Sequence, residues 1–216
     1  MGILNVTPDS FSGDGLDERP DEALARAKEM AAQGADILDI GGESTRPGAA
    51  SVSVEEEIRR VIPVLKQVAT EISIPISIDT YKSEVARQAL DCGASIINDV
   101  WGLKEDIELA SLAAERGVPI ILMHNQKGAA YKDMMAEVLA SLRWSVAQAI
   151  KAGVPAENII IDPGIGFGKT VEHNLEIMRR LDEFAVLGYP LLLGTSRKST
   201  IGKILDLPPD QRLEGT

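Results

Sequence analysis

The feature of this sequence that most restricts its fold is a repeated alternation of short apolar runs with longer amphipathic stretches. The runs are rich in Leu, Ile and Val, and most are apolar along their length rather than at every second position. Such runs are typical of strands buried on both faces of a parallel sheet. We expect strands at 3–6, 36–40, 74–78, 95–100, 119–124, 159–163 and 190–194.

The stretches between these runs have helical periodicity, and we expect helices at 20–33, 54–71, 81–92, 105–116, 131–152, 171–187 and 199–206. The segment Ser53-Val-Glu-Glu56 has the pattern of a capping box at a helix start. Several helices should end at a glycine, where a left-handed residue closes the last turn: Gly34, Gly93, Gly117, Gly153 and Gly188.

Seven strand-then-helix units predict an α/β fold of the (β/α)₈ barrel type, apparently truncated before the eighth strand. A doubly wound open sheet is the structural alternative. No linker or composition break divides the chain, so we expect a single barrel domain over residues 1–216, incomplete at both ends.

Nearly every predicted strand ends in a polar or glycine-rich segment. These segments are NVTPDSF, GGESTRPG, DTYKS, ND, MH, DPGIGFG and GTSRKS, in chain order. Any one of them could be a helix cap or a solvated charge. In a parallel barrel, however, all of them lie on the face that carries the active site, and capping alone does not account for seven in succession.

The residue types at these ends suit a flat heterocycle with several N–H groups. Asp79, Asn98 and Asp162 offer oxygen acceptors, and Lys198 offers a cation for a ring carbonyl. Met123 and Phe167 could sandwich the ring, although core packing explains them almost as well.

A second group of residues suits an anion. Thr45, Arg46 and the N-termini of the helices that follow the strands are suited to a phosphate group. Asn5 could bind Mg²⁺, which often takes few protein ligands and completes its shell with waters and substrate phosphates.

The segment Gly164-Ile-Gly-Phe-Gly-Lys-Thr170 resembles a nucleotide-binding P-loop but has the wrong spacing. A P-loop needs its first glycine at position 163, which is Pro163. We therefore expect the glycines to let the backbone turn beside a bound ring, Thr170 to cap the next helix, and Lys169 to be a surface or helix-start charge.

The formal net charge of −11 disfavours nucleic acid and anionic membranes as partners, because both repel an acidic surface. No apolar run is long enough to span a membrane, and no signal peptide opens the sequence. Cys92 is the only cysteine, which excludes an internal disulfide and indicates a small buried hydrophobe. Two histidines are too few for a His-rich metal centre. A cytoplasmic protein is the expectation.

Taken together, the motifs resemble those of the dihydropteroate synthase family of bacterial folate biosynthesis. They are GILNVTPDSFS, DIGGESTRPGA, IPISIDTYKSEVA, IINDVWG, ILMHN, IIIDPGIGFGKT and LLLGTSRKS, and they extend through the chain in order. The resemblance implies a (β/α)₈ transferase and sulfonamide target. Such an enzyme joins 6-hydroxymethyl-7,8-dihydropterin pyrophosphate to p-aminobenzoate, forming 7,8-dihydropteroate and pyrophosphate.

The resemblance also implies residue roles. Asp79, Asn98, Asp162 and Lys198 would hold the pterin, with Asp79, Asp162 and Lys198 acting in catalysis. Thr45 and Arg46 would lie near the pyrophosphate and the aminobenzoate, Asn5 would reach a Mg²⁺–pyrophosphate group, and Ser199 would receive the aminobenzoate carboxylate. The mechanism would be dissociative: pyrophosphate leaves first, and the aminobenzoate nitrogen then attacks a pterin methylene cation.

Two departures from the family pattern concern the ends of the substrates. The first loop has Ser12-Gly13-Asp14-Gly15 where the family has SFSDGG, so Asp14 stands one position later than the usual acid. The family's Arg-x-His motif of the last strand is absent from the sequence. The family usually forms homodimers through late helices, so a homodimer is one alternative for the assembly.

Two other functions fit parts of the same pattern. Corrinoid-dependent methyltetrahydrofolate methyltransferases share the pterin-binding barrel, but they have no pyrophosphate or aminobenzoate to bind, and GTSRKS and GGESTRPG favour the synthase. A pterin-binding but inactive truncated barrel is the other alternative.

Overall fold

The computed structural model describes residues 1–7, 20–44 and 50–216. Over these residues six strands form one parallel sheet, and each strand pairs with the next in chain order. The strands are β1 (Gly2–Asn5), β2 (Leu38–Gly41), β3 (Ile76–Asp79), β4 (Ile96–Asp99), β5 (Ile120–Met123) and β6 (Ile159–Asp162). This is the strand order of an α/β barrel wall.

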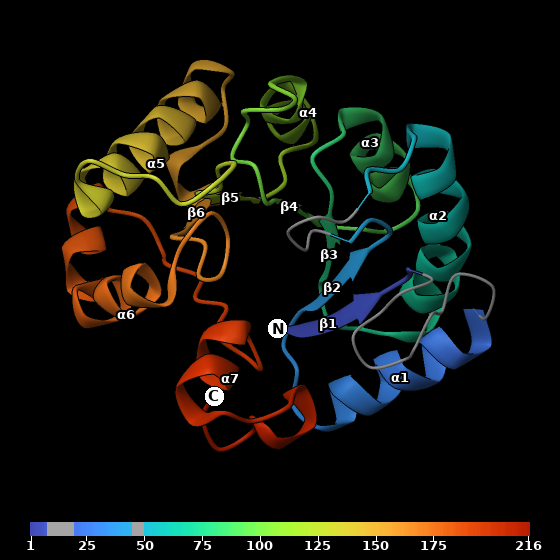
Figure 1. Cartoon of the computed structure of the whole chain (residues 1–216). Helices are drawn as coiled ribbons and strands as arrows, with labels where there is room; N and C mark the ends of the chain where they lie inside the picture. The colour runs from blue at the N-terminus through green and yellow to red at the C-terminus, as the bar shows by residue number, and fades with distance from the viewer. Residues whose placement is uncertain (8–19, 45–49) are drawn as a thin grey trace.

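Helices α1 to α5 connect the strands, α6 and α7 follow β6, and the helices lie around the outside of the curved sheet (Figure 1). They are α1 (Pro20–Ala32), α2 (Val54–Glu71), α3 (Ser83–Asp91), α4 (Glu108–Arg116), α5 (Met134–Lys151), α6 (Val171–Arg179) and α7 (Ser199–Leu205). Short 3₁₀ helices accompany them in the described part of the chain: η1 (Ala156–Asn158), η2 (Leu181–Leu187) and η3 (Pro209–Gln211). Within the described ranges, no helix is both long and apolar enough to cross a bilayer.

The main core fills the space between the sheet and these helices. Every residue of β2, β4 and β5 is buried, as the uninterrupted apolar runs predict. Helix α2 contributes Val61, Val64, Leu65 and Val68, all completely buried. Their spacing places them on one face of the helix, against the sheet. The core therefore holds the strand ends in fixed relative positions.

Most of the expected element boundaries are confirmed to within a few residues, and α2 has the predicted bounds. The five predicted helix-end glycines all have positive φ angles. Ser53 caps α2 by accepting from the backbone N–H of Glu56 at 3.2 Å. The Glu56 carboxylate, however, accepts from Arg59 and Arg60, so only the serine half of the expected capping box is seen.

Two sequence expectations need correction. The strand at 190–194 is reduced to a single bridge between Leu191 and Ile161, because Pro190 has no N–H to donate and Leu193 turns toward solvent. The helix at 171–187 divides into α6 and η2, because Arg180 leaves the α-helical region, with φ −113° and ψ 28°. Its guanidinium contacts both Glu176 and Glu183 across this break.

Candidate active site

The carboxyl ends of the strands bring the predicted polar residues together. The parallel register pairs Asn5 with Gly41, Gly41 with Asp79, and Asp79 with Asn98. Farther along the sheet, Met123 pairs with Asp162. Five of the residues expected from sequence therefore lie along one edge of the sheet, where an α/β barrel has its active site.

Asn98 is oriented by an acid that the sequence reasoning missed. Its Nδ2 donates to both carboxylate oxygens of Asp39, at 3.3 and 3.2 Å, and both residues are buried. With its NH₂ group held there, the Asn98 amide presents its oxygen elsewhere, as an acceptor. The only signal in the sequence was Asp39 itself, a charged residue between Leu38 and Ile40 in the run DILDI, because a buried carboxylate needs a partner.

Asp79 lies close to several other acidic side chains. Burial raises the pKa of Asp79 well above its usual value, and the nearby carboxylates of Asp39 and Glu57 raise it further. Burial also raises the pKa of Asp39 to about 6. Asp79 Oδ1 is buried with no hydrogen-bond partner among the described residues. A buried oxygen left unpaired is costly, so this atom is a candidate contact for a ligand N–H or a cation.

Asp162 begins the glycine-rich segment, and its Oδ1 accepts from the backbone N–H of Gly164 at 2.7 Å. Burial raises its pKa, while the nearby Lys198 and Lys169 act in the opposite direction. Gly164 has φ +72°, and a Cβ there would lie 2.0 Å from the His124 carbonyl oxygen. The sharp turn expected at this glycine is therefore confirmed. The close approach of the His124 carbonyl explains why the position has no room for a side chain.

Lys198 reaches back over the same segment. Its Nζ donates to the Ile165 carbonyl and lies 4.5 Å from the centre of the Phe167 ring, a cation–π distance. Burial lowers its pKa, partly offset by the carboxylates of Asp162 and Asp79. The predicted group of Asp79, Asp162, Lys198 and Phe167 thus shares one electrostatic environment.

Met123 is buried, but it is not part of the core cluster between the sheet and the helices. Its neighbour Leu122 belongs to that cluster. Because successive side chains of a strand point to opposite faces, Met123 points to the inner face of the sheet. This placement favours the expectation of a ring contact over core packing.

Lys169 is not the surface charge that the sequence suggested. Its Nζ donates to the carbonyl oxygens of Gly164, at 3.0 Å, and Phe167, at 2.9 Å, and lies 2.8 Å from His124 Nδ1. Burial lowers its pKa to about 7. The expectation was wrong because a lysine after a glycine turn can fold back over its own loop. Thr170, by contrast, caps α6 as expected.

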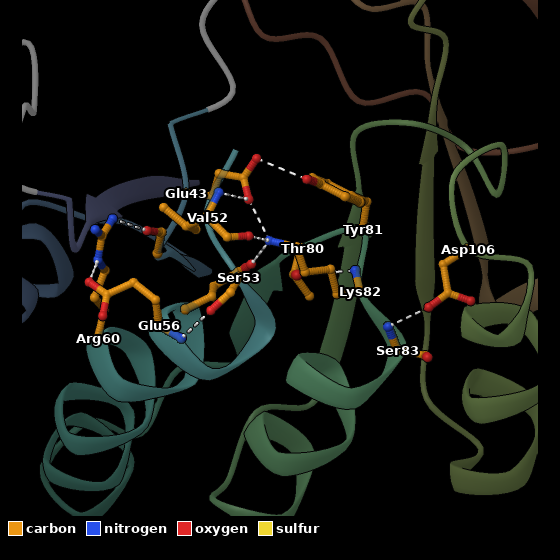
Figure 2. Close-up of polar contacts among 12 residues, drawn as sticks. Glu43, Val52, Ser53, Glu56, Arg60, Thr80, Tyr81, Lys82, Ser83 and Asp106 are labelled. Carbon is orange, nitrogen blue, oxygen red and sulfur yellow. Dashed lines mark hydrogen bonds and ion pairs between the residues drawn. The ribbon is translucent and has the colours of Figure 1, made fainter. Parts of the chain in front are cut away.

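Another lysine with little exposure, Lys82, lies beside the site in the cluster of Figure 2. Lys82 donates to Glu43, to the Val52 carbonyl at 2.9 Å, and to Glu57, whose Oε2 is 2.5 Å away. Tyr81 donates to the other oxygen of Glu43 at 2.9 Å. These contacts join the chain between β2 and α2 to α2 and to the start of α3. The one sequence signal for these contacts is Glu57, an acid within the apolar face of α2.

Of the remaining predicted residues, some are exposed and others lie outside the described part of the chain. Asn5 is exposed at the end of β1, and Ser199 is exposed as the first residue of α7. Thr45, Arg46 and Asp14 lie outside the described residues. In the described segments, no group of three or more His, Cys, Asp or Glu side chains could hold a metal ion. Asn5 fits only a metal that takes most of its ligands from water and phosphate, as Mg²⁺ often does.

Comparison with known proteins agrees with this geometry. The family model described as "Pterin binding enzyme" matches residues 1–216. The dihydropteroate synthase of Bacillus subtilis is 57% identical over 216 residues, which cover all of this chain and 76% of that protein. The chain belongs to the dihydropteroate synthase family. It is accordingly a transferase of folate biosynthesis, which joins the dihydropterin pyrophosphate to p-aminobenzoate.

Solved structures of the family have the same fold. The Clostridium difficile dihydropteroate synthase, determined in the presence of pteroic acid, is 54% identical and superposes with a TM-score of 0.95. All of this chain and 82% of that one are covered. The Xanthomonas albilineans dihydropteroate synthase with 4-aminobenzoic acid is 45% identical with a TM-score of 0.93, covering all of this chain and 79% of that one. The six-stranded sheet thus belongs to the barrel of this family.

Proposed function

We propose that the strand-end site binds the pterin ring of the diphosphate substrate through Asp79, Asn98, Asp162 and Lys198, and that the reaction is dissociative. The observation that carries the proposal is Asp79 Oδ1, a buried oxygen with no hydrogen-bond partner in the part of the chain that the structure describes. It lies beside an Asn98 amide whose NH₂ group is already held by Asp39. Both offer oxygen acceptors where a pterin presents ring N–H groups. Pteroic acid, present in the Clostridium difficile structure, contains such a ring.

The several acidic side chains near Asp79 favour the binding of a positively charged group in the site. Burial and the neighbouring carboxylates raise the pKa of Asp79 because both disfavour its charged form, and a nearby cation would stabilise that charged form. In the proposed first step, the methylene C–O bond breaks and its electron pair leaves with pyrophosphate, so positive charge spreads over the pterin. Asp79, Asp39 and Asp162 stabilise that charge where it develops.

In the proposed second step, the lone pair of the aminobenzoate nitrogen forms the new C–N bond, and the nitrogen releases a proton to water. The protein supplies no nucleophile. His124 is not placed to act as a nucleophile, because its Nδ1 is already in contact with Lys169. Burial also lowers the pKa of His124 to about 3. Positioning and charge stabilisation are the protein's contributions to the rate.

Aromatic and sulfur groups flank the proposed ring site. Met123 points inward from β5, and Phe167 lies on the loop after β6, stacked under Lys198. Lys198 would donate to the ring carbonyl in place of its present contact with Ile165. Such an exchange leaves no buried ammonium without a partner.

The anionic ends of the substrates would use the residues around this ring site. Thr45 and Arg46 are proposed for the pyrophosphate and the aminobenzoate, and Ser199 for the aminobenzoate carboxylate. Asn5 would hold Mg²⁺, which when bound would neutralise charge on the leaving pyrophosphate oxygens. We also propose that the protein forms a homodimer, because the family usually does.

The test replaces Asp79 by Asn and compares it with Asp36→Asn. Asp36 is an exposed acid just before the opposite end of β2, so it controls for the loss of one charge. We expect Asp79→Asn to weaken pteroic acid binding about ten- to a hundred-fold, the effect of losing a hydrogen bond to a charged group. Asp36→Asn should bind as the wild type does. Equal affinity of all three proteins in calorimetric titration would reject the ring assignment.

Pyrophosphate release measured with both substrates separates this function from the alternatives. A methyltetrahydrofolate methyltransferase would release none, and a pterin-binding but inactive barrel would bind pteroic acid without turnover. We expect release that depends on p-aminobenzoate in steady state.

A further inference from the structure

The loop formed by residues 163–168 carries Phe167 and receives Lys198, so its shape sets two groups of the proposed site. It contains three glycines with positive φ, at 164, 166 and 168. Glycines lower the cost of this conformation but also give the unfolded loop more freedom to lose. Some other group must therefore hold the loop in one shape.

Lys169 is placed to do this from the inner side. An ammonium group has three donors, and Lys169 Nζ has three acceptors within 3.0 Å: two carbonyls of the loop and His124 Nδ1. It thus ties the start of the loop to its end. With Nδ1 accepting, the His124 ring carries its proton on Nε2.

His124 provides the fixed point for this tie. It follows directly after β5, is 2% exposed, and donates its backbone N–H to the Asp162 carbonyl at 2.9 Å. Its own carbonyl is the oxygen that excludes any side chain at Gly164. Lys169 therefore joins the loop to the wall of the sheet, not only to itself.

The outer side of the loop has other supports. Tyr131 donates to the Gly168 carbonyl at 2.8 Å, and Gly166 donates its N–H to Asn174 Oδ1 at 2.9 Å. Neither contact reaches the carbonyls of Gly164 and Phe167, although the Gly164 carbonyl also accepts from the Phe167 backbone N–H at 3.1 Å. Loss of Lys169 would leave those two oxygens and His124 Nδ1 without this donor.

We infer that Lys169 and His124 are positioning residues, which lock loop 163–168 so that Phe167 and Lys198 face the pterin ring. This inference rests on the proposed function of the site. Neither residue touches the reacting atoms. Their effect should appear in pterin recognition and much less in aminobenzoate recognition.

The experiment uses Lys169→Met, which keeps the length of the side chain and removes its donors. It is paired with His124→Leu, which removes the acceptor, and His124→Asn, whose amide oxygen replaces Nδ1. Lys151→Met is the matched control, because Lys151 is an exposed lysine at the end of α5. Steady-state KM for each substrate, pteroic acid affinity and thermal midpoint are measured for every variant.

We expect Lys169→Met and His124→Leu to raise KM for the dihydropterin pyrophosphate about ten- to a hundred-fold and to change KM for p-aminobenzoate less than about three-fold. His124→Asn should restore most of the loss seen in His124→Leu. The double variant Lys169→Met/His124→Leu should lose less than the product of the two single effects, since the two groups act on each other.

A purely structural role would lower the thermal midpoint and the active fraction but leave both KM values unchanged, and that result would overturn the inference. So would wild-type pterin affinity in Lys169→Met. If Lys169→Met does not fold, the His124→Leu and His124→Asn pair decides by the same KM comparison. Failure of the wild type itself to bind pteroic acid would instead reject the proposed function.

Discussion

At the scale of single residues, the buried acids make stability depend on pH. The folded protein raises the pKa of Asp39 from 3.8 to about 6, because burial disfavours its charged form. Between these values the folded protein holds a proton that the unfolded chain has released. The resulting stabilisation is full below about pH 4 and is lost as the pH rises through about 6.

Asp39→Asn should therefore flatten the pH dependence of stability. Urea unfolding of the wild type and the variant at a series of pH values from about 4 to 7 measures the difference. We expect the wild type to lose free energy of unfolding relative to Asp39→Asn as the pH rises through this window. Parallel curves would show that Asp39 is ionised in the folded protein throughout.

A second residue-scale prediction concerns Gly164, with Gly128 as its control. Both have positive φ, +72° and +79°, but a Cβ at Gly128 meets nothing within 4 Å, whereas one at Gly164 meets the His124 carbonyl. Gly128→Ala should cost only the conformational strain, about 1–2 kcal/mol. Gly164→Ala should cost about 1–3 kcal/mol more and should weaken pteroic acid binding. Equal losses from the two variants in chemical denaturation would contradict the close approach.

At the scale of elements, the Lys82 cluster joins α2, the start of α3 and the segment between β2 and α2 (Figure 2). The side chains of Lys82 and Glu57 are 13% and 1% exposed. Lys82→Met would leave two buried carboxylates facing each other, and we expect a loss of about 3–5 kcal/mol in the free energy of unfolding. Changing Glu57 to Gln in the same chain should recover part of it.

The matched control for this prediction is Lys28→Met, which breaks an ion pair between α1 and α2. Both of its partners are 51% exposed, so the loss should be under about 1 kcal/mol. Denaturant unfolding of the two variants tests the contrast. A small loss in Lys82→Met would mean that water, rather than Lys82, solvates Glu43 and Glu57.

Local patterns in the sequence were enough to predict most elements and the edge at which the site forms. Apolar runs identified β1 to β6, and the polar residues at the carboxyl ends of these runs identified Asp79, Asn98, Asp162 and the neighbouring loops. The run at 190–194 failed as a strand because apolarity reports burial, not pairing, and Pro190 interrupts the ladder.

Most of the contacts that sequence reasoning missed join residues far apart in the sequence. Asp39 reaches Asn98 across 59 positions, Lys82 reaches Glu43 across 39, and Lys169 reaches His124 across 45. Periodicity and spacing describe neighbours along one element, so they cannot show which buried charge meets which. The contact of Lys169 with His124 was missed for this reason, whereas its contacts with Gly164 and Phe167 are local and arise because the side chain folds back over its own loop.

At the scale of the whole molecule, a rigid sheet presents acceptors along one edge while loops supply the cations. Asp79 and Asn98 come from strands β3 and β4, whereas Lys198 and Phe167 approach from the segments after β6. The pterin ring is thus proposed to contact residues fixed by the sheet, and the pyrophosphate and carboxylate groups are proposed to contact loop residues. This division predicts that strand-end variants affect pterin binding chiefly, with smaller effects on the aminobenzoate.

The most direct test of this account is a crystal structure of the protein with pteroic acid bound. The account predicts a pterin ring between Met123 and Phe167, with ring N–H groups donating to Asp79, Asn98 and Asp162 and the ring carbonyl accepting from Lys198. It also predicts that Lys169 keeps its contacts with Gly164, Phe167 and His124. A ring bound elsewhere, or one that leaves Asp79 Oδ1 unpaired, would contradict the central claim.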